Sequence, residues 1–326
     1  MGKNKRLTFY LLLFFAAISN KLFAFEVDGI CYEINQNGQG VVYVSKSTSD
    51  VQYVKLPSSV TYEGKTYLVT EIANESFANC TNLISIALPE HLESIGDKAF
   101  YGCSSLESIT IPNSVTYIGD MAFYLCENLS SLIIEDDTDA VLSLDYSAFD
   151  NCPLKTITLG RNLDYEDSPF VMNYSLESVQ VTSSVTSLGN NLFDDCTNLS
   201  SVSLPESLTQ IGKSAFEGCA SLKTIQLPNS IKNIGEKAFY CTNLTPLVLP
   251  ESLDSIGNQA FDAYSNWESV TIPKSVTWIG SGAFGSNLRF LRLDGGTDAE
   301  LHLEEDALVI VFRSVEQPKT IRNIQA

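Results

Sequence analysis

The cysteines of this chain follow a regular pattern, and thiols can serve as nucleophiles, metal ligands or disulfide partners. Seven of the eight come two or three residues after a phenylalanine that recurs at a nearly fixed interval. Side chains at one position of a stacked repeat point in parallel, so we interpret these cysteines as a buried column of inert, structural thiols. The column comprises Cys80, Cys103, Cys126, Cys152, Cys196, Cys219 and Cys241.

Disulfide bonds and a metal site are weaker interpretations of the same residues. Stacked coils lie about 4.8 Å apart, a spacing that permits disulfides between neighbouring coils, but parallel side-chain vectors disfavour the dihedral angle that a disulfide needs. No paired Cys-x-x-Cys spacing is present and the two histidines are scattered, so no zinc site is indicated. We predict no metal and no cofactor. Cys31 lies outside the column, and its redox state stays open.

Catalysis finds little support in the two histidines. His91 occupies a turn position that is Ser207 in another repeat, and His302 sits between two apolar residues of an acidic segment. Neither has a nucleophile motif nearby, and a solvated acidic surface explains the many carboxylates. We therefore predict that the protein is not an enzyme and has no catalytic residues.

Two acidic segments could supply oxygen ligands to calcium. Neither fits an EF-hand loop or a regular calcium-binding nonapeptide. A solvated polar insertion is the favoured interpretation, and calcium binding stays open as the alternative. The carboxylates concerned are Glu135, Asp136, Asp137 and Asp139 in one segment, and Asp294, Asp298 and Glu300 in the other.

The phenylalanine that precedes the cysteines recurs ten times, mostly every 23 residues. A fixed period in this range indicates a solenoid, in which each unit buries its apolar face only by stacking on its neighbours. Leu308 occupies the same place in an eleventh, degenerate unit, so we predict about eleven coils. The phenylalanines are Phe77, Phe100, Phe123, Phe149, Phe170, Phe193, Phe216, Phe239, Phe261 and Phe284.

The clearest unit runs from Leu106 to Cys126 and reads LESITIPNSVTYIGDMAFYLC. Its first half alternates apolar and polar residues as a half-buried strand does, with Ile109 and Ile111 facing inward. The piece from Val115 to Gly119 predicts a second short strand, and the Ala-Phe-x-x-Cys piece predicts a tight helical turn. We therefore expect a β-rich solenoid with parallel strands on its concave face and short second strands and tight helical turns elsewhere.

The segment before the repeats has a different pattern. Two strand-like stretches, Gly29–Ile34 and Val41–Val44, predict an N-terminal β cap, since an open solenoid end exposes an apolar edge. An insertion of about nine residues then lengthens the first coil and carries a turn at Glu63-Gly64-Lys65.

The N-terminus reads as an export signal, because Lys3, Lys5 and Arg6 precede an apolar run from Leu7 to Ile18. That run is too short for a comfortable membrane span, and no later segment is apolar enough for a transmembrane segment in the mature chain. A retained interfacial anchor is the alternative. We expect an exported protein that is secreted, periplasmic or on the cell surface, divided into a signal peptide (1–24), an N-terminal β cap (25–50), the solenoid (51–308) and a C-terminal cap or final coil (309–326).

The charge balance excludes one class of partner. The chain has 39 acidic and 20 basic residues and a formal net charge of −19. A field of that sign repels phosphate backbones, so nucleic acid is not expected as a partner.

The outward positions of the first strands define one long face, small, hydroxyl-rich and nearly uncharged. β-propensity and solubility would explain such a face without a ligand. The functional interpretation is a docking surface for an extended partner or a glycan. Aromatic and apolar character increases toward its C-terminal end, at Pro246, Val248, Trp267, Trp278, Phe290 and Arg292. The candidate residues are Ser108, Thr110, Thr156, Thr158, Ser178, Gln180, Ser201, Ser203, Thr224, Gln226, Ser269, Thr271, Phe290 and Arg292.

The unit resembles the BspA-like class of bacterial leucine-rich repeats, which reads L-x-x-I-x-L-P-x-x-L/V-x-x-I-G-x-x-A-F-x-x-C. The match extends from about Val51 to Leu308. The resemblance implies a leucine-rich-repeat solenoid, exported or on a cell surface, that takes part in adhesion to host proteins or other cells. We expect a non-catalytic protein-binding module of a bacterium, with a host or bacterial surface protein as partner. The alternative is a glycan-binding protein of nutrient capture.

Overall fold

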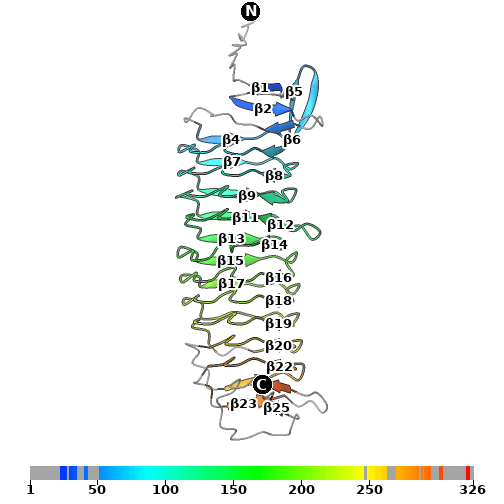
Figure 1. The fold of residues 1–326 in the computed structure, drawn as a ribbon, viewed down its shortest axis with the longest axis vertical. Helices are drawn as coiled ribbons and strands as arrows, with labels where there is room; N and C mark the ends of the chain where they lie inside the picture. Colours follow the sequence, from blue (N-terminus) through cyan, green and yellow to red (C-terminus); the bar gives the residue numbers. More distant parts are fainter. Residues whose placement is uncertain are drawn as a thin grey trace, which may run out of the picture.

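The chain forms an elongated stack of coils in the computed structural model (Figure 1). Every regular element that the structure describes is a β-strand, and no described segment is a helix of the length and apolarity that a bilayer span requires. The described residues are 23–27, 29–34, 40–42, 51–245, 248–262, 269–285, 288, 290–294, 301–303 and 321–323.

The first strands of seven successive coils form a parallel sheet, named here the first-strand sheet. It has seven strands in the order β17 (Ser201–Ser203), β15 (Ser178–Val181), β13 (Thr156–Leu159), β11 (Ser131–Ile134), β9 (Ser108–Ile111), β7 (Ser85–Ala87) and β4 (Tyr53–Lys55). In β9 the exposures of Ile109 and Ile111 are 2% and 0%, whereas Ser108 and Thr110 are exposed. The predicted period of two is therefore confirmed.

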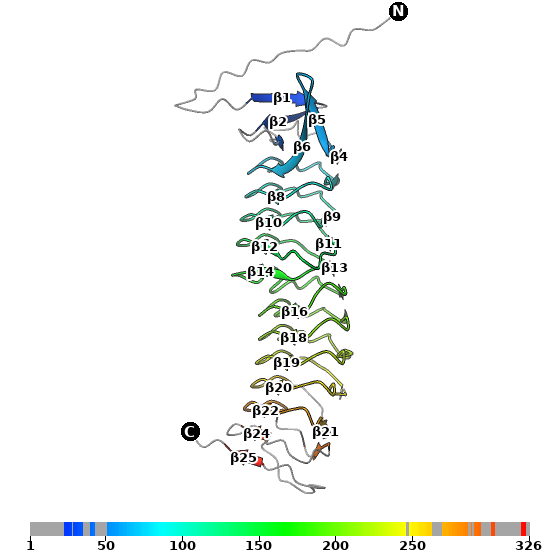
Figure 2. The same ribbon diagram turned by 90° about the vertical axis from the view of Figure 1, so that its right-hand side faces the viewer.

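The second strands are shorter and form two further sheets along the stack (Figure 2). One contains β1 (Phe23–Val27), β2 (Ile30–Ile34), β3 (Gly40–Val42), β6 (Lys65–Ile72), β8 (Ser94–Ile95), β10 (Tyr117–Ile118), β12 (Leu142–Leu144) and β14 (Leu163–Tyr165), with β5 (Ser59–Tyr62) paired to β6. The other contains β16 (Ser187–Leu188), β18 (Gln210–Ile211), β19 (Asn233–Ile234), β20 (Ser255–Ile256), β22 (Trp278–Ile279), β24 (Leu301–Leu303) and β25 (Ile321–Asn323).

A glycine follows most of the second strands because the neighbouring coil leaves no room for a side chain. At Gly119 an added Cβ would lie 2.4 Å from Asp97 Oδ1 and 2.7 Å from the Asp97 backbone nitrogen. Contacts below 3 Å with backbone cannot be relieved by a rotamer change. The glycine of the motif is thus required by close approach of two coils.

The return segment of each coil is not the helical turn that the sequence predicted. Met121 and Leu125 have φ of 52° and 60°, and left-handed residues so close together are incompatible with an α-helix. The segment is a series of β-turns, as shown by the bond from Cys126 N to Phe123 O at 3.2 Å. Alternate N–H groups donate to the next coil instead, as Phe123 N does to Ala148 O at 2.9 Å. We name this second set of bonds the turn ladder.

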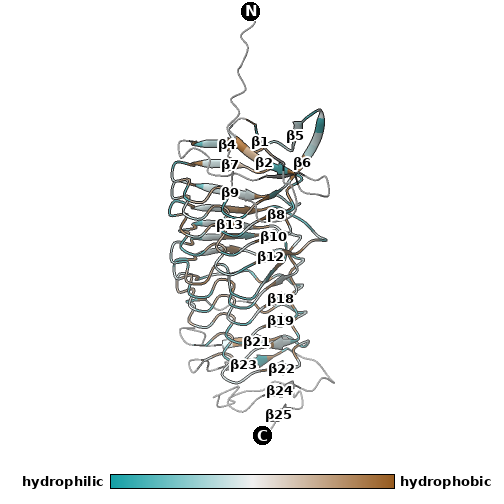
Figure 3. Cartoon of the chain, turned by 45° about the horizontal axis from the view of Figure 1, so that its top comes forward, coloured by the Kyte–Doolittle hydropathy of each residue, from teal (hydrophilic) through white to brown (hydrophobic). Residues whose placement is uncertain are grey.

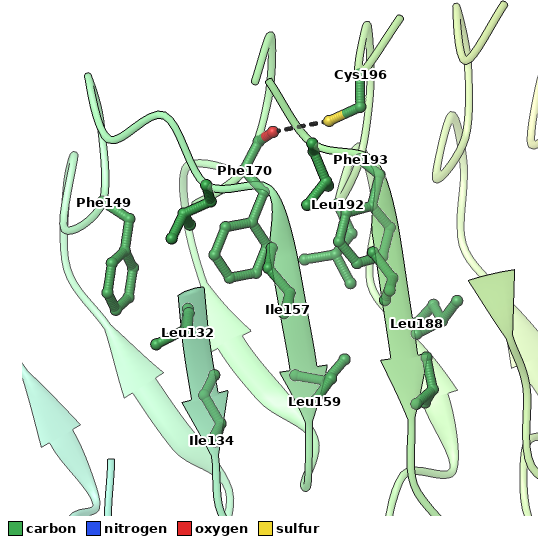
Figure 4. Close-up of a cluster of buried hydrophobic side chains, with 14 of the residues drawn as sticks. Leu132, Ile134, Phe149, Ile157, Leu159, Phe170, Leu188, Leu192, Phe193 and Cys196 are labelled. Carbon is green, nitrogen blue, oxygen red and sulfur yellow. Dashed lines mark hydrogen bonds between the residues drawn. The ribbon is translucent and has the colours of Figure 1, made fainter. Parts of the chain in front are cut away.

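The repeated phenylalanines form a single file of buried rings inside the stack. Their ring centroids lie 5.0 Å apart for Phe100 and Phe123 and 5.9 Å apart for Phe149 and Phe170. Figure 4 shows Phe149, Phe170 and Phe193 projecting among the inward residues of the first strands. Full burial of such a ring stabilises the fold by about 1.5–3 kcal/mol relative to exposure, so the phenylalanine column is a main source of coil-to-coil cohesion.

The predicted number of coils was too high for the described residues. Ten buried rings, from Phe77 to Phe284, span about nine turns of the solenoid. The unit predicted at Leu308 lies outside the described residues.

The N-terminal strands add antiparallel pairs to the end of the stack. Phe25 of β1 stacks on Tyr32 of β2 and on Tyr62 of β5, with centroids 5.6 Å and 4.5 Å apart. The Glu63-Gly64-Lys65 turn is confirmed, because β5 and β6 form a hairpin in which Glu63 and Gly64 have positive φ. The sequence missed β1, which runs through the expected signal cleavage point.

Candidate functional site

The outward residues of the first-strand sheet lie in straight columns across the coils. Ser131 pairs in register with Ser108 on one side and Thr156 on the other, and the pairing continues through Ser178 to Ser201. The second column contains Thr110, Ile133, Thr158, Gln180 and Ser203. The structure thus brings together eight of the candidate residues on one surface, named here the strand face.

From β7 to β17 the strand face presents mostly small side chains and no charged ones. Its outward side chains there are serine, threonine, alanine, glutamine and a single isoleucine, Ile133, which is 40% exposed. Neighbouring hydroxyls are close enough to bond, since Thr156 Oγ1 lies 3.2 Å from Ser131 Oγ. In Figure 3 hydrophobic and hydrophilic segments alternate along the coils, as expected where each strand has one inward and one outward set.

The predicted face does not continue unbroken to the C-terminal coils. Thr224 and Gln226 are exposed but belong to no strand, and no backbone hydrogen bond joins them to β17. Ser269 and Thr271 belong to β21 (Ser269–Ile272), which forms a separate two-stranded sheet with β23 (Phe290–Leu293). In that pair Arg292 is exposed, and the side chain of Phe290 lies outside the described residues.

The predicted aromatic character at this end is only partly on the face. Trp278 belongs to β22 of the second-strand sheet, so it is not a strand-face residue. Val248, by contrast, is 88% exposed. Pro246 and Trp267, which were also expected to contribute, lie outside the described residues.

The cysteines occupy equivalent positions in successive coils, and none of the eight forms a disulfide. Each thiol from Cys103 to Cys219 donates to the carbonyl oxygen of the phenylalanine of the preceding coil, as Cys196 does to Phe170 O at 3.2 Å (Figure 4). Burial raises the pKa of Cys196 to about 12. The thiols are therefore protonated hydrogen-bond donors and not nucleophiles. Cys241 is only half-buried and forms the edge of the column.

The histidines and acidic segments do not assemble a metal site in the part of the chain that the structure describes, where no group of three His, Cys, Asp or Glu side chains is placed to hold an ion. His91 is exposed on its turn, and the side chain of His302 lies outside the described residues. Of the second acidic segment, Asp294 alone is described.

The first acidic segment has a structural partner instead of an ion. Asp137 Oδ1 accepts the backbone N–H groups of Asp139 and Ala140 at 2.8 Å and 2.9 Å. These two bonds, and the charge of Arg161, lower the pKa of Asp137 below its ordinary value. The carboxylate is therefore ionised and already held by donors of its own chain.

Arg161 is a buried cation that the sequence did not single out. Its side chain is fully buried, and its Nη1 and Nη2 donate to Asn113 O at 2.7 Å and Pro112 O at 2.9 Å. Burial lowers its pKa, whereas the charges of Asp137 and Glu135 raise it. The LGRNL segment gave only a weak signal, because the position of Arg161 is polar in other coils too, as at Asn113 and Glu206.

Comparison with known proteins gives a consistent set of matches. The model of the BspA type leucine rich repeat region matches residues 47–171 and 165–289, with six copies. A solved leucine-rich repeat protein from Bacteroides ovatus is 24% identical over 92% of this chain and 90% of its own, with a TM-score of 0.58, and shares the solenoid fold.

Two other solved structures match with lower TM-scores. A leucine rich cell surface protein from Faecalibacterium prausnitzii is 21% identical, with a TM-score of 0.39 over 86% of this chain and 97% of its own. A leucine rich repeat protein from T. pallidum is 26% identical, with a TM-score of 0.48 over 61% of this chain and 90% of its own. No curated protein matches the sequence.

Proposed function

The chain belongs to the BspA type leucine-rich repeat proteins, and from this membership we propose that it is an exported, non-catalytic protein-binding module of a bacterium. Its strand face would dock a protein of a host or bacterial surface. The observation that carries the proposal is the uncharged strip from β7 to β17, on a chain whose formal net charge is −19.

Small side chains suit such a strip to protein binding. Immobilising a long, flexible side chain at an interface costs about 0.5–1.5 kcal/mol, and serine and threonine have little rotamer freedom to lose. Their hydroxyls both donate and accept hydrogen bonds. Because the backbone of the strand face is fixed by parallel pairing, a partner meets a preorganised surface.

Export is supported by the basic and apolar N-terminal segment, which has the composition of a signal peptide. A free, buried thiol column is compatible with an oxidising compartment, because parallel side-chain vectors disfavour the dihedral angle that a disulfide needs.

Glycan binding is the competing function, and the described strand face favours it less. Carbohydrate platforms would need exposed aromatic rings, and among the described side chains of this face the aromatic one is Tyr53, 68% exposed at its N-terminal end. The test of the proposal must nevertheless include glycans.

The decisive experiment compares two single arginine variants of the full chain without residues 1–24. Thr158→Arg places a long cation in the middle of the strand face, and Gln210→Arg places the same group on the exposed outer side of β18. The native chain and both variants are immobilised and exposed to biotin-labelled surface proteins of host and bacterial cells. The same three chains are tested on a glycan array.

We expect the native chain and Gln210→Arg to retain the same proteins and Thr158→Arg to lose them. Equal retention by all three chains would show that the strand face is not the docking surface. Retention of glycans but of no protein would replace the proposal by its alternative.

A further inference from the structure

One bond of the turn ladder, from Phe170 N to Leu192 O, is missing in one described coil, and the ladder is most fully interrupted one coil earlier, between the return segments of Phe149 and Phe170. In the preceding coil Phe123 N and Leu125 N donate to Ala148 O and Asp150 O. The equivalent donors of the next coil, Phe149 N and Asn151 N, have no acceptor among the described residues. The carbonyls they would reach by the same register, those of Pro169 and Val171, accept no hydrogen bond either.

The sequence of the following coil explains the interruption. That coil is 21 residues long, and Pro169 replaces the alanine that precedes the phenylalanine in most other coils. The rings of Phe149 and Phe170 are tilted by 37°, whereas Phe123 and Phe149 are nearly parallel at 3°. Asn173 stands near the place of the missing column cysteine and donates to Cys152 O at 3.0 Å. The two return segments are consequently tied at one edge and open elsewhere.

The opening is a cleft of about 640 Å³ between the two return segments. That volume lies within the range of ligand-sized sites, about 300–1,000 Å³. Phe149 and Asn151, whose N–H groups are free, line the cleft together with Pro169 and Val171, whose carbonyls are free. Groups spaced by two along a wall match the period of an extended chain.

The rim of the cleft is apolar on one side and acidic on the other. Met172 and Tyr174 are 55% and 56% exposed, although both lie in an ordered coil. Glu127 and Asp150 also line the cleft, and no basic side chain does. Exposed apolar residues beside unpaired backbone are typical of a surface that is covered by a partner.

We propose that this cleft binds an extended peptide segment of another protein, with an apolar side chain against Met172 and Tyr174 and a basic side chain beside Glu127. The peptide backbone would replace the missing bonds of the turn ladder, as in strand addition at a sheet edge. The cleft is on the return turns and not on the strand face. This site is therefore tested independently of the docking surface proposed above.

The test begins with a defined probe, a phage-displayed library of random linear peptides panned on the full chain without residues 1–24. Selected peptides are synthesised with a fluorophore, and their Kd is measured by anisotropy. We expect enrichment of sequences in which lysine or arginine lies near a large apolar residue. Failure to enrich any linear peptide would overturn the proposal.

Matched variants then locate the binding site. Met172 and Met121 both have left-handed backbone, with φ of 56° and 52°, a conformation that asparagine adopts readily. Met172→Asn should therefore fold at least as well as the native chain yet weaken binding about tenfold or more, whereas Met121→Asn, outside the cleft, should leave Kd unchanged. Equal effects of the two variants would count against the cleft.

Charge and backbone contacts are tested in the same assay. Glu127→Lys should weaken binding. Glu251 is an exposed acid on a distant turn, so Glu251→Lys should change Kd only as far as the altered net charge does. N-methylation of alternate peptide residues should abolish binding in one register and leave it intact in the other. Insensitivity to N-methylation in both registers, or capture of glycans that Met172→Asn abolishes, would rule out the extended-peptide mode.

Discussion

The guanidinium of Arg161 hydrogen-bonds to the backbone carbonyl of Asn113 at 2.7 Å, although the two residues are 48 positions apart in the sequence. The coil between the two carries the acidic insertion, whose Asp137 N donates to Gly160 O at 3.2 Å. Because that insertion takes the place of an ordinary corner, the arginine side chain fills the corner and satisfies carbonyls of the coil beyond it.

We expect Arg161→Lys to lower the free energy of unfolding by about 1–3 kcal/mol, because one ammonium cannot serve both carbonyls in the fork geometry of a guanidinium. Urea denaturation at neutral pH measures the loss. Arg292→Lys, on an exposed strand position, is the matched control and should change stability little. Equal effects of the two substitutions would show that the two hydrogen bonds of the buried Arg161 guanidinium do not stabilise the fold.

Asp194 should make the stability of the fold fall as the pH rises, which is opposite in sign to the effect of a salt-bridged acid. Burial, and the charges of Glu217 and Asp195, raise its pKa to about 6 from 3.8. The contribution of Asp194 to the free energy of unfolding is therefore most favourable at low pH, and it is lost as the pH rises from about 4 to about 6. Asp194→Asn should be more stable than the native chain at pH 7, and the difference should vanish below about pH 4. A difference that is constant from pH 3 to 7 would contradict this assignment.

The thiol column predicts two classes of cysteine in the folded protein. Cys31 and Cys241 are partly exposed, whereas the other six thiols are buried. Burial also raises the pKa of Cys103 and Cys219. We expect the aromatic disulfide DTNB to titrate the two exposed thiols quickly in native protein and the remaining six only in urea. Rapid reaction of all eight thiols under native conditions would disprove the buried column.

The close approach at Gly119 predicts a strong effect of a single methyl group. Gly119→Ala places a Cβ against the Asp97 backbone, so the coils must separate locally, and we expect a loss of about 2 kcal/mol or more. Gly64→Asn is the contrasting variant, since Gly64 has positive φ but open surroundings and asparagine tolerates that conformation. If thermal unfolding showed equal losses for both, steric contact between coils would not be the cause.

The acidic insertion predicts no stabilisation by calcium. Asp137 Oδ1 already accepts two backbone N–H groups, so much of the negative charge of this carboxylate is satisfied within the chain. Thermal unfolding with millimolar calcium should match that with magnesium or chelator. An upward shift specific to calcium would reinstate the metal site that the sequence left open.

The sequence predicted features that one repeat contains within itself. The position of Phe123 in its unit already implies a ring stacked on Phe100, because identical positions in successive coils meet. The same logic gave the thiol column and the inward and outward sets of β9. These properties follow from the repeat period, because each position of one coil meets the same position of the next. The sequence of one repeat is therefore enough to predict them.

Features that depend on how an irregular coil meets its neighbours were beyond that logic. The reach of Arg161 to Asn113 requires the path of the insertion between them. The helical turn was wrong because Met121 and Leu125, neither of them glycine, adopt left-handed backbone that residue type alone does not indicate. The cleft at Met172 follows from Pro169 and a short coil, whose joint effect on hydrogen bonding appears only in three dimensions.

The short coil that contains β13 and β14 has a mechanical meaning. On one side it lacks turn-ladder bonds, and on the other its second strand is joined to the next coil by side chains, with Asn162 Oδ1 accepting Thr186 N at 3.0 Å and Tyr165 OH donating to Asn190 O at 2.9 Å. The second strands are joined by backbone pairing from β6 to β14 and from β16 to β22, but not between β14 and β16, and at this coil only the first-strand sheet continues unbroken, through β11, β13 and β15. Under bending or tension this coil is the compliant joint, and the segments on either side would move and unravel as two stiff blocks.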